Sequence, residues 1–206
     1  LDRDGLHPVR GHLAQERVEG GGLAAAGRPR GQHEAVKVSI ELGRGSKALD
    51  QRQGAAVALF APYVNSYRRY VPDFAAPINL EWGRDNRTTG LRVPISSPAA
   101  RRIENRLPGM DCNPYLGIAS TLACGYLGLM NKTQARPEFS GSAYIDSEDI
   151  PVNLGDALDL LDEDQALKEV MGVEFVKVYD SVKRNEYKEF LQVISPWERE
   201  HLLLNV

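Results

Sequence analysis

Apolar positions in the second half of the chain recur at three- and four-residue steps, which predicts a series of helices. The first follows Asn113, which we expect to be an N-cap because proline occupies the next position. Its apolar side chains share one face, and we expect this helix to be buried. They are Tyr115, Ile118, Ala119, Leu122, Tyr126, Leu129 and Met130. Two further helices are predicted to start at Asn153 and Asp164, the second ending at Gly172.

The last stretch of the chain predicts two more helices. The first is marked by Phe175, Val178, Tyr179 and Val182. The second begins at Ser195, because Ser195-Pro196-Trp197-Glu198 has the form of a capping box with proline at the first helical position. Between residues 136 and 151 we expect a loop.

Shorter alternating stretches before this helical half predict strands. They run from Ile78 to Trp82, from Thr88 to Val93 and from Arg102 to Leu107. Residues 55–70 ahead of them are expected to form a short helix that runs into a polar loop. A few antiparallel strands followed by a helical carboxy-terminal half indicate an α+β fold.

The first 54 residues differ in composition from the rest. All five Phe, two Trp and eight Tyr lie at Phe60 or later, and only Val36 to Leu42 alternates like a strand. Without aromatic residues we expect residues 6–54 to lack a packed core. Two interpretations stay open, a disordered arm and a stretch that is not natural coding sequence. We therefore divide the chain into an atypical segment, 1–54, and a domain, 55–206.

Composition and charge narrow the class of protein. The formal charge of −3 argues against a nucleic-acid binder, and no apolar run has the roughly 20 residues of a membrane span. Cys112 and Cys124 would lie roughly 18 Å apart along a helix, too far for a disulfide, so we expect buried thiols and a cytoplasmic location. The chain starts without a methionine or a signal-peptide pattern, and we expect it to be part of a longer protein.

Eight arginines lie between Arg68 and Arg106. On a strand, Arg102, Glu104 and Arg106 would point to one face. One interpretation is a solvated face with cross-strand ion pairs. The other is a cleft for several negative charges and a divalent metal, because arginine binds carboxylates and phosphates with two hydrogen bonds.

Four ordered motifs over about 145 residues resemble the carboxy-terminal part of the glutamine synthetase catalytic domain. They are Asn65-Ser66-Tyr67-Arg68-Arg69 with Val71-Pro72, Arg87-Thr88-Thr89-Gly90-Leu91-Arg92-Val93-Pro94, Arg101-Arg102-Ile103-Glu104-Asn105-Arg106, and Asn113-Pro114-Tyr115-Leu116. The resemblance implies an ATP-dependent ligase that phosphorylates the side-chain carboxylate of glutamate and then transfers the acyl group to an amine.

The resemblance also implies roles for individual residues. Arg69 and Arg106 would hold glutamate, Arg87 would face the transferred phosphoryl group, Arg92 and Arg102 would bind the nucleotide phosphates together with Arg87, and Glu104 would bind Mg²⁺ or Mn²⁺. The resemblance also implies that Arg92 lies on the same side as Arg102, Glu104 and Arg106. Metal-binding strands that precede this region in the family are missing, so we expect the chain alone to be inactive. His201 is expected to be structural. The resemblance further implies a homo-oligomer for the full-length protein.

Two positions depart from the family pattern. Ala75 stands where glutamine synthetases carry a flap glutamate that binds ammonium, and Ala99 stands where a nucleotide-contacting lysine is usual. With Ala75 and the stretch from Trp82 to Thr88, the sequence resembles gamma-glutamylpolyamine-type synthetases. This resemblance favours an organic amine as the acceptor. Ordinary glutamine synthetase and a non-catalytic relative remain as alternatives.

Overall fold

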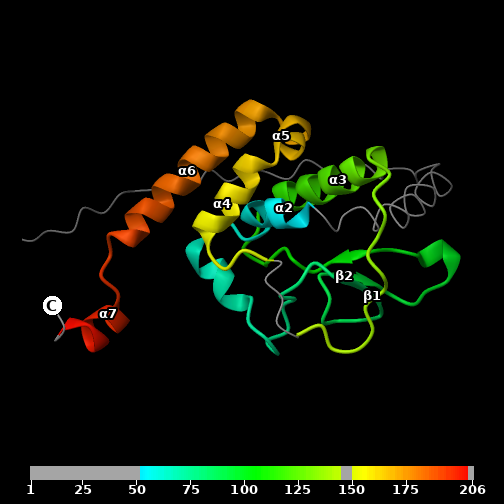
Figure 1. Cartoon of the computed structure of the whole chain (residues 1–206), viewed down its shortest axis with the longest axis horizontal. Coiled ribbons are helices and arrows are strands. Elements are labelled where there is room, and N and C mark those ends of the chain that lie inside the picture. Colours follow the sequence, from blue (N-terminus) through cyan, green and yellow to red (C-terminus); the bar gives the residue numbers. More distant parts are fainter. Residues whose placement is uncertain (1–51, 145–149, 204–206) are drawn as a thin grey trace, which may run out of the picture. The chain divides into compact units, whose positions relative to one another are not determined.

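The computed structural model describes residues 52–144 and 150–203 (Figure 1). Its helices are α2 (Gln53–Phe60), α3 (Pro114–Met130), α4 (Leu154–Glu163), α5 (Gln165–Met171), α6 (Val173–Leu191) and α7 (Pro196–His201), with two short 3-10 helices at Val64–Arg69 and Pro98–Ala100. The strands are β1 (Trp82–Arg84), β2 (Leu91–Val93) and β3 (Glu104–Asn105). This order confirms the predicted α+β class. The expectation about residues 6–54 lies outside the described residues, apart from the last few positions.

Side-chain caps fix the predicted helix starts. The Asn113 side chain accepts hydrogen bonds from the backbone N–H groups of Tyr115 and Leu116 at the start of α3. Asn153 and Asp164 cap α4 and α5 in the same way, and α5 ends at Gly172, whose φ of 98° favours glycine. Ser195 and Glu198 form the predicted capping box of α7.

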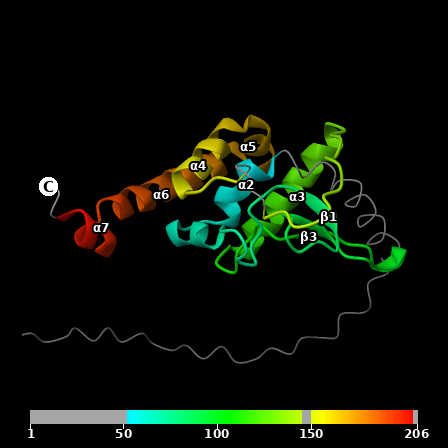
Figure 2. The same cartoon turned by 60° about the horizontal axis from the view of Figure 1, so that its bottom comes forward.

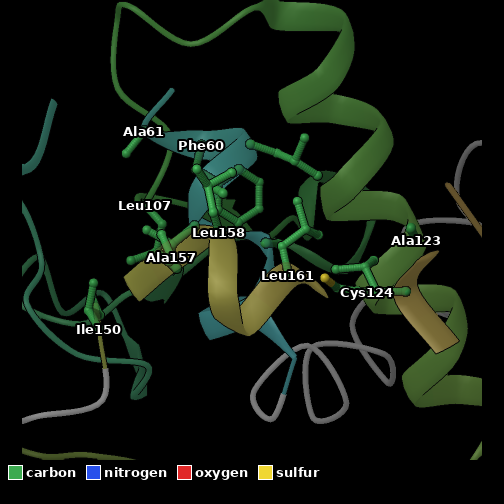
Figure 3. Close-up of a cluster of buried hydrophobic side chains, with 14 of the residues drawn as sticks. Phe60, Ala61, Leu107, Ala123, Cys124, Ile150, Ala157, Leu158 and Leu161 are labelled. Carbon is green, nitrogen blue, oxygen red and sulfur yellow. The ribbon is translucent and has the colours of Figure 1, made fainter. Parts of the chain in front are cut away.

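The core forms where α2 meets the helical half. Figures 1 and 2 both place α2 beside α4, and α2 is buried along nearly its whole surface. Phe60 of α2 and Leu158 and Leu161 of α4 belong to one cluster of buried side chains (Figure 3). The Tyr179 hydroxyl of α6 donates to the Ala58 carbonyl at 2.7 Å. A short helix that is apolar on all sides is therefore held at the centre of the described fold.

The small sheet differs in one respect from the prediction. β2 and β3 pair antiparallel, as expected, but β1 and β2 pair parallel, with Trp82 opposite Leu91. Buried Asn79 explains the change, since its amide oxygen accepts from the backbone N–H groups of Glu81 and Gly90 and so brings the two strand starts together. Alternation of side chains carries no information about such a link. The second and third strands are also shorter than predicted, and the first lies at Trp82–Arg84 and not at Ile78–Trp82.

The expectation that the large apolar side chains of α3 are buried is wrong. Tyr115, Ile118 and Met130 are each more than 60 % exposed, and Leu122 and Tyr126 are about half exposed. The buried side consists of smaller residues, namely Gly117, Ser120, Ala123, Cys124, Gly125, Leu127 and Gly128. These allow close approach, because a Cβ at Gly117 would lie 2.8 Å from the Cys112 sulfur. The periodicity identified the apolar face of α3, but it could not show which part of the protein packs against that face. No described residue covers the face.

No helix among the described residues is long and apolar enough to cross a membrane. Both cysteines are free thiols, as the sequence predicts, although only Cys124 is fully buried and Cys112 is partly exposed. Burial raises the pKa of the Cys124 thiol to about 12, so it stays protonated.

Candidate functional site

The pairing of β2 with β3 brings together charged residues from two of the sequence motifs. Arg92 lies opposite Glu104 in the register, and its Nη1 donates to Glu104 Oε2 at 2.8 Å. The Nε of Arg106 lies 3.5 Å from Glu104 Oε1. We call Asp85, Arg92, Glu104 and Arg106 the arginine cluster. The prediction that Arg92, Glu104 and Arg106 share one side is confirmed.

Asp85 joins the cluster although the sequence did not single it out. Arg92 donates from Nε to Asp85 Oδ1 at 3.1 Å and from Nη2 to the same oxygen. Its hydrogen bonds to Asp85 and Glu104 raise the pKa of Arg92 above its ordinary value, so the group stays charged. Asp85 directly follows β1, and the parallel pairing of β1 with β2 places it near Arg92.

Arg102 does not join this cluster. It precedes β3, is exposed, and donates weakly to the Ala100 carbonyl at 3.4 Å, making no ion pair among the described residues. The prediction that one strand carries Arg102, Glu104 and Arg106 is wrong, since β3 covers only Glu104–Asn105. The predicted strand is therefore shortened at its start, where residues 101–103 connect the 3-10 helix Pro98–Ala100 to β3.

Arg69 and Arg106 each have a buried guanidinium nitrogen that finds no hydrogen-bond partner among residues 52–144 and 150–203. These are Nε of Arg69 and Nη1 of Arg106. Arg69 Nη2 donates to the Tyr70 hydroxyl at 2.9 Å, and Arg106 Nη2 donates to the Ala75 carbonyl at 3.0 Å. Buried polar groups in proteins are nearly always hydrogen-bonded. Two charged donors without a partner are a reason to expect an anionic ligand.

The segment that carries Ala75 is exposed and has unusual backbone geometry. Asp73 and Ala75 have φ angles of 59° and 65°, a region that residues with a Cβ rarely adopt. The Ala75 side chain carries no charge, and its carbonyl is held by Arg106. The segment is thereby tied to the arginine cluster through its main chain alone.

Arg87 lies apart from the cluster, on the loop between β1 and β2. It is exposed and lines an open hollow of about 470 Å³ together with Arg84, Asp85 and Glu138. Arg84 and Glu138 form a bidentate ion pair, in which Nε and Nη2 of Arg84 both donate to the Glu138 carboxylate. These hydrogen bonds lower the pKa of Glu138. Because Asp85 borders this hollow and binds Arg92, Arg87 and the arginine cluster lie at neighbouring places on one surface.

The described residues supply a limited set of metal ligands. No group of three or more His, Cys, Asp or Glu side chains among them could hold a metal ion. Mg²⁺ usually binds through one or two carboxylates together with phosphate oxygens and water. Glu104, whose two oxygens keep free lone pairs, fits as one ligand of a nucleotide-bound ion. His201 stacks on Trp197 in α7, which fits the structural part expected of it.

The ion pairs of the arginine cluster would by themselves also fit a solvated face. Two observations favour a site instead. The side chains of Arg92 and Arg106 are only 18 % and 16 % exposed, and Arg106 keeps an unpaired buried nitrogen. A solvated face would leave such groups hydrated.

Residues 49–202 match the family model described as glutamine synthetase, catalytic domain. Similar curated proteins include a glutamine synthetase of Methanocaldococcus jannaschii, 37 % identical over 153 residues, which cover 70 % of this chain and 34 % of that protein. Gamma-glutamylethanolamide synthetase GlnA4 of Streptomyces coelicolor is 38 % identical over 141 residues, covering 68 % and 30 %. Gamma-glutamylputrescine synthetase PuuA of Escherichia coli is 32 % identical over 190 residues, covering 82 % and 40 %.

A solved structure described as apo GmaS without ligand resembles this fold. The TM-score is 0.67 at 27 % sequence identity, and the match covers 80 % of this chain and 38 % of that chain. The chain thus spans about a third of the length of the curated relatives it matches.

Proposed function

The chain belongs to the glutamine synthetase family, and we propose that the full-length protein uses ATP to join the side-chain carboxylate of glutamate to an amine. The observation that carries this proposal is the pair of buried guanidinium nitrogens, one on Arg69 and one on Arg106, that have no partner within the described part of the chain. Both residues belong to family motifs, and a charged donor that no described residue uses is suited to bind a substrate carboxylate. The chain alone, with about a third of its relatives' length, is expected to be inactive.

The proposed reaction has two steps. An oxygen of the glutamate side-chain carboxylate attacks the terminal phosphorus of ATP, and ADP leaves, which gives an acyl phosphate. The amine nitrogen then attacks the acyl carbon, loses a proton and expels inorganic phosphate. Such phosphoryl transfer depends mainly on positioning and on neutralising negative charge. A surface that gathers several arginines is suited to both tasks.

Each candidate residue has a proposed task in these steps. Arg69 and Arg106 bind glutamate, Arg87 meets the transferred phosphoryl group, Arg92 and Arg102 bind the nucleotide phosphates, and Glu104 holds Mg²⁺ or Mn²⁺. When bound, the metal ion would neutralise charge on the phosphate oxygens. Arg102 is exposed and unpaired by acidic groups among the described residues, which leaves it available to a phosphate.

We favour an organic amine over ammonium as the acceptor. Ala75 offers neither the charge nor the volume of the flap glutamate in ordinary glutamine synthetases. Two of the similar proteins are named for amide products of ethanolamine and putrescine, which supports this choice. Ordinary glutamine synthetases are also among them, so ammonium is the alternative acceptor. We expect the full-length protein to be a cytoplasmic homo-oligomer, and the two free thiols support the reducing compartment.

The first prediction concerns the glutamate site. Arg106→Lys removes the forked guanidinium, and in the full-length protein it should raise KM for glutamate roughly 10- to 100-fold, the effect of losing a charged hydrogen bond of about 1.5–3 kcal/mol. The assay measures ADP formation that depends on glutamate and an amine. Arg68→Lys is the matched control, because Arg68 is exposed and should tolerate the change within about twofold. Equal KM values for the two variants would remove Arg106 from the proposed site.

A further inference from the structure

Tyr70 contacts the Arg69 guanidinium in two ways. The Cζ atom of Arg69 lies 4.4 Å from the centroid of the Tyr70 ring, a cation–π distance. Arg69 Nη2 also donates a hydrogen bond to the Tyr70 hydroxyl at 2.9 Å. The two residues are adjacent in the chain, at the end of the 3-10 helix Val64–Arg69. One side chain therefore fixes both the plane and the rotation of the guanidinium.

The Tyr70 hydroxyl is itself held by the main chain. It donates to the Leu107 carbonyl at 2.9 Å, so its proton is engaged and a lone pair is left for Arg69. Desolvation raises the pKa of Tyr70 to about 12, which keeps this proton in place at physiological pH. Leu107 directly follows Arg106. The hydroxyl thus ties Arg69 to the segment that carries the other proposed glutamate ligand.

Close packing on another side leaves little room for Arg69 to turn. A Cβ atom at Gly109 would lie 3.1 Å from Arg69 Nε and 2.3 Å from Asp111 Oδ1. The glycine is therefore needed for this arrangement, because any side chain would push against one of the two groups. Arg69 Nε remains buried and unpaired, so the contacts that hold the guanidinium leave this donor unused.

We propose that Tyr70 is a positioning residue, which acts through Arg69 and sets the affinity for glutamate. It does so through its stacked ring, its hydrogen bond from the guanidinium and its hydrogen bond to the Leu107 carbonyl. The proposal rests on the proposed function. Arg69 should contact glutamate equally before and during the reaction, so loss of positioning should weaken binding and leave the chemical step unchanged. The family resemblance did not point to Tyr70, since the matching motif consists of residues 65–69 and 71–72 and leaves position 70 out.

The test compares Tyr70→Phe with Tyr67→Phe in the full-length protein. Tyr70→Phe keeps the ring and deletes the hydroxyl that joins Arg69 to Leu107. Tyr67→Phe deletes a hydroxyl three residues earlier that is buried but has no hydrogen-bond partner among the described residues. We expect Tyr70→Phe to raise KM for glutamate roughly tenfold, with kcat and KM for ATP within about twofold. Tyr67→Phe should leave all three within about twofold.

Two outcomes would overturn the proposal. One is a Tyr70→Phe variant that matches Tyr67→Phe in KM for glutamate. The other is a parallel change in kcat and both KM values, which would mark a merely structural role. If the wild-type protein shows no glutamate-dependent activity, it is the proposed function that fails.

A measurement on the 206-residue chain tests the contact separately from activity. Nitrogen NMR of labelled arginine should show slowed rotation of the Arg69 Nη2 group, with the signal assigned by its loss in Arg69→Lys. Tyr70→Phe should restore fast rotation, and Tyr67→Phe should not. An unchanged Arg69 signal in Tyr70→Phe would overturn the proposal whatever the enzyme assays give.

Discussion

Glu104→Gln is expected to lower kcat of the full-length protein roughly a hundredfold or more, equivalent to about 2.7 kcal/mol of transition-state stabilisation. Glutamine keeps the size of the side chain but lacks the negative charge that a divalent ion requires. It also deprives Arg92 and Arg106 of the carboxylate that lies between them, at 2.8 Å from Arg92 Nη1 and 3.5 Å from Arg106 Nε. Both losses disturb the region where the phosphates are proposed to bind.

The same variant should need more metal. The Mg²⁺ concentration that gives half the maximal rate should rise at least about tenfold, because even outer partners of metal ligands change affinity by 10–100-fold. Glu81→Gln is the matched control, since Glu81 is also an ion-paired glutamate but its partner, Arg136, lies outside the cluster. A Glu104→Gln variant with normal kcat and normal Mg²⁺ dependence would show that Glu104 does not serve the metal.

Ala75→Glu should move the acceptor preference toward ammonium by one to two powers of ten in kcat/KM. A flap carboxylate near the amine would restore a charged interaction of about 1.5–3 kcal/mol. A longer amine gains about 0.8 kcal/mol for each buried methylene, so its use depends less on that charge. Both alanine and glutamate carry a Cβ, so the positive φ of 65° strains them alike. The assay compares ammonium, methylamine, putrescine and spermidine at saturating ATP and glutamate.

Ala75→Gln separates the charge from the volume of the new side chain. It should reduce the use of long amines by filling the space, without improving the use of ammonium. If the wild-type protein uses ammonium best and Ala75→Glu leaves the ranking unchanged, the acceptor is ammonium and the organic-amine proposal is wrong.

Local chemistry made much of the fold predictable from sequence. Asn113, Asn153 and Ser195 start helices through hydrogen bonds that span only two or three residues, and such short-range signals are readable without a structure. The shared side of Arg92, Glu104 and Arg106 was also predictable, because strand alternation groups Glu104 with Arg106 and the family resemblance adds Arg92.

Features that depend on distant residues could not be predicted in this way. The sequence predicted that the large apolar side chains of α3 are buried, but its smaller residues are buried and most of the large ones are exposed. The periodicity was clear, but which side of a helix is buried depends on what surrounds the helix. The parallel pairing of β1 and β2 depends on buried Asn79, and it places Asp85 near Arg92. Tyr70 contacts the Leu107 carbonyl across 37 positions of sequence, and no local pattern marks such a contact.

Oxygen transfer tests the central claim most directly. With glutamate labelled by ¹⁸O in its side-chain carboxylate, an acyl phosphate intermediate carries one labelled oxygen into phosphate when the amine displaces it. We predict that the full-length protein, supplied with ATP, Mg²⁺ and an amine, releases inorganic phosphate with one ¹⁸O for each amide formed. Amide or ADP formation with unlabelled phosphate would contradict the account.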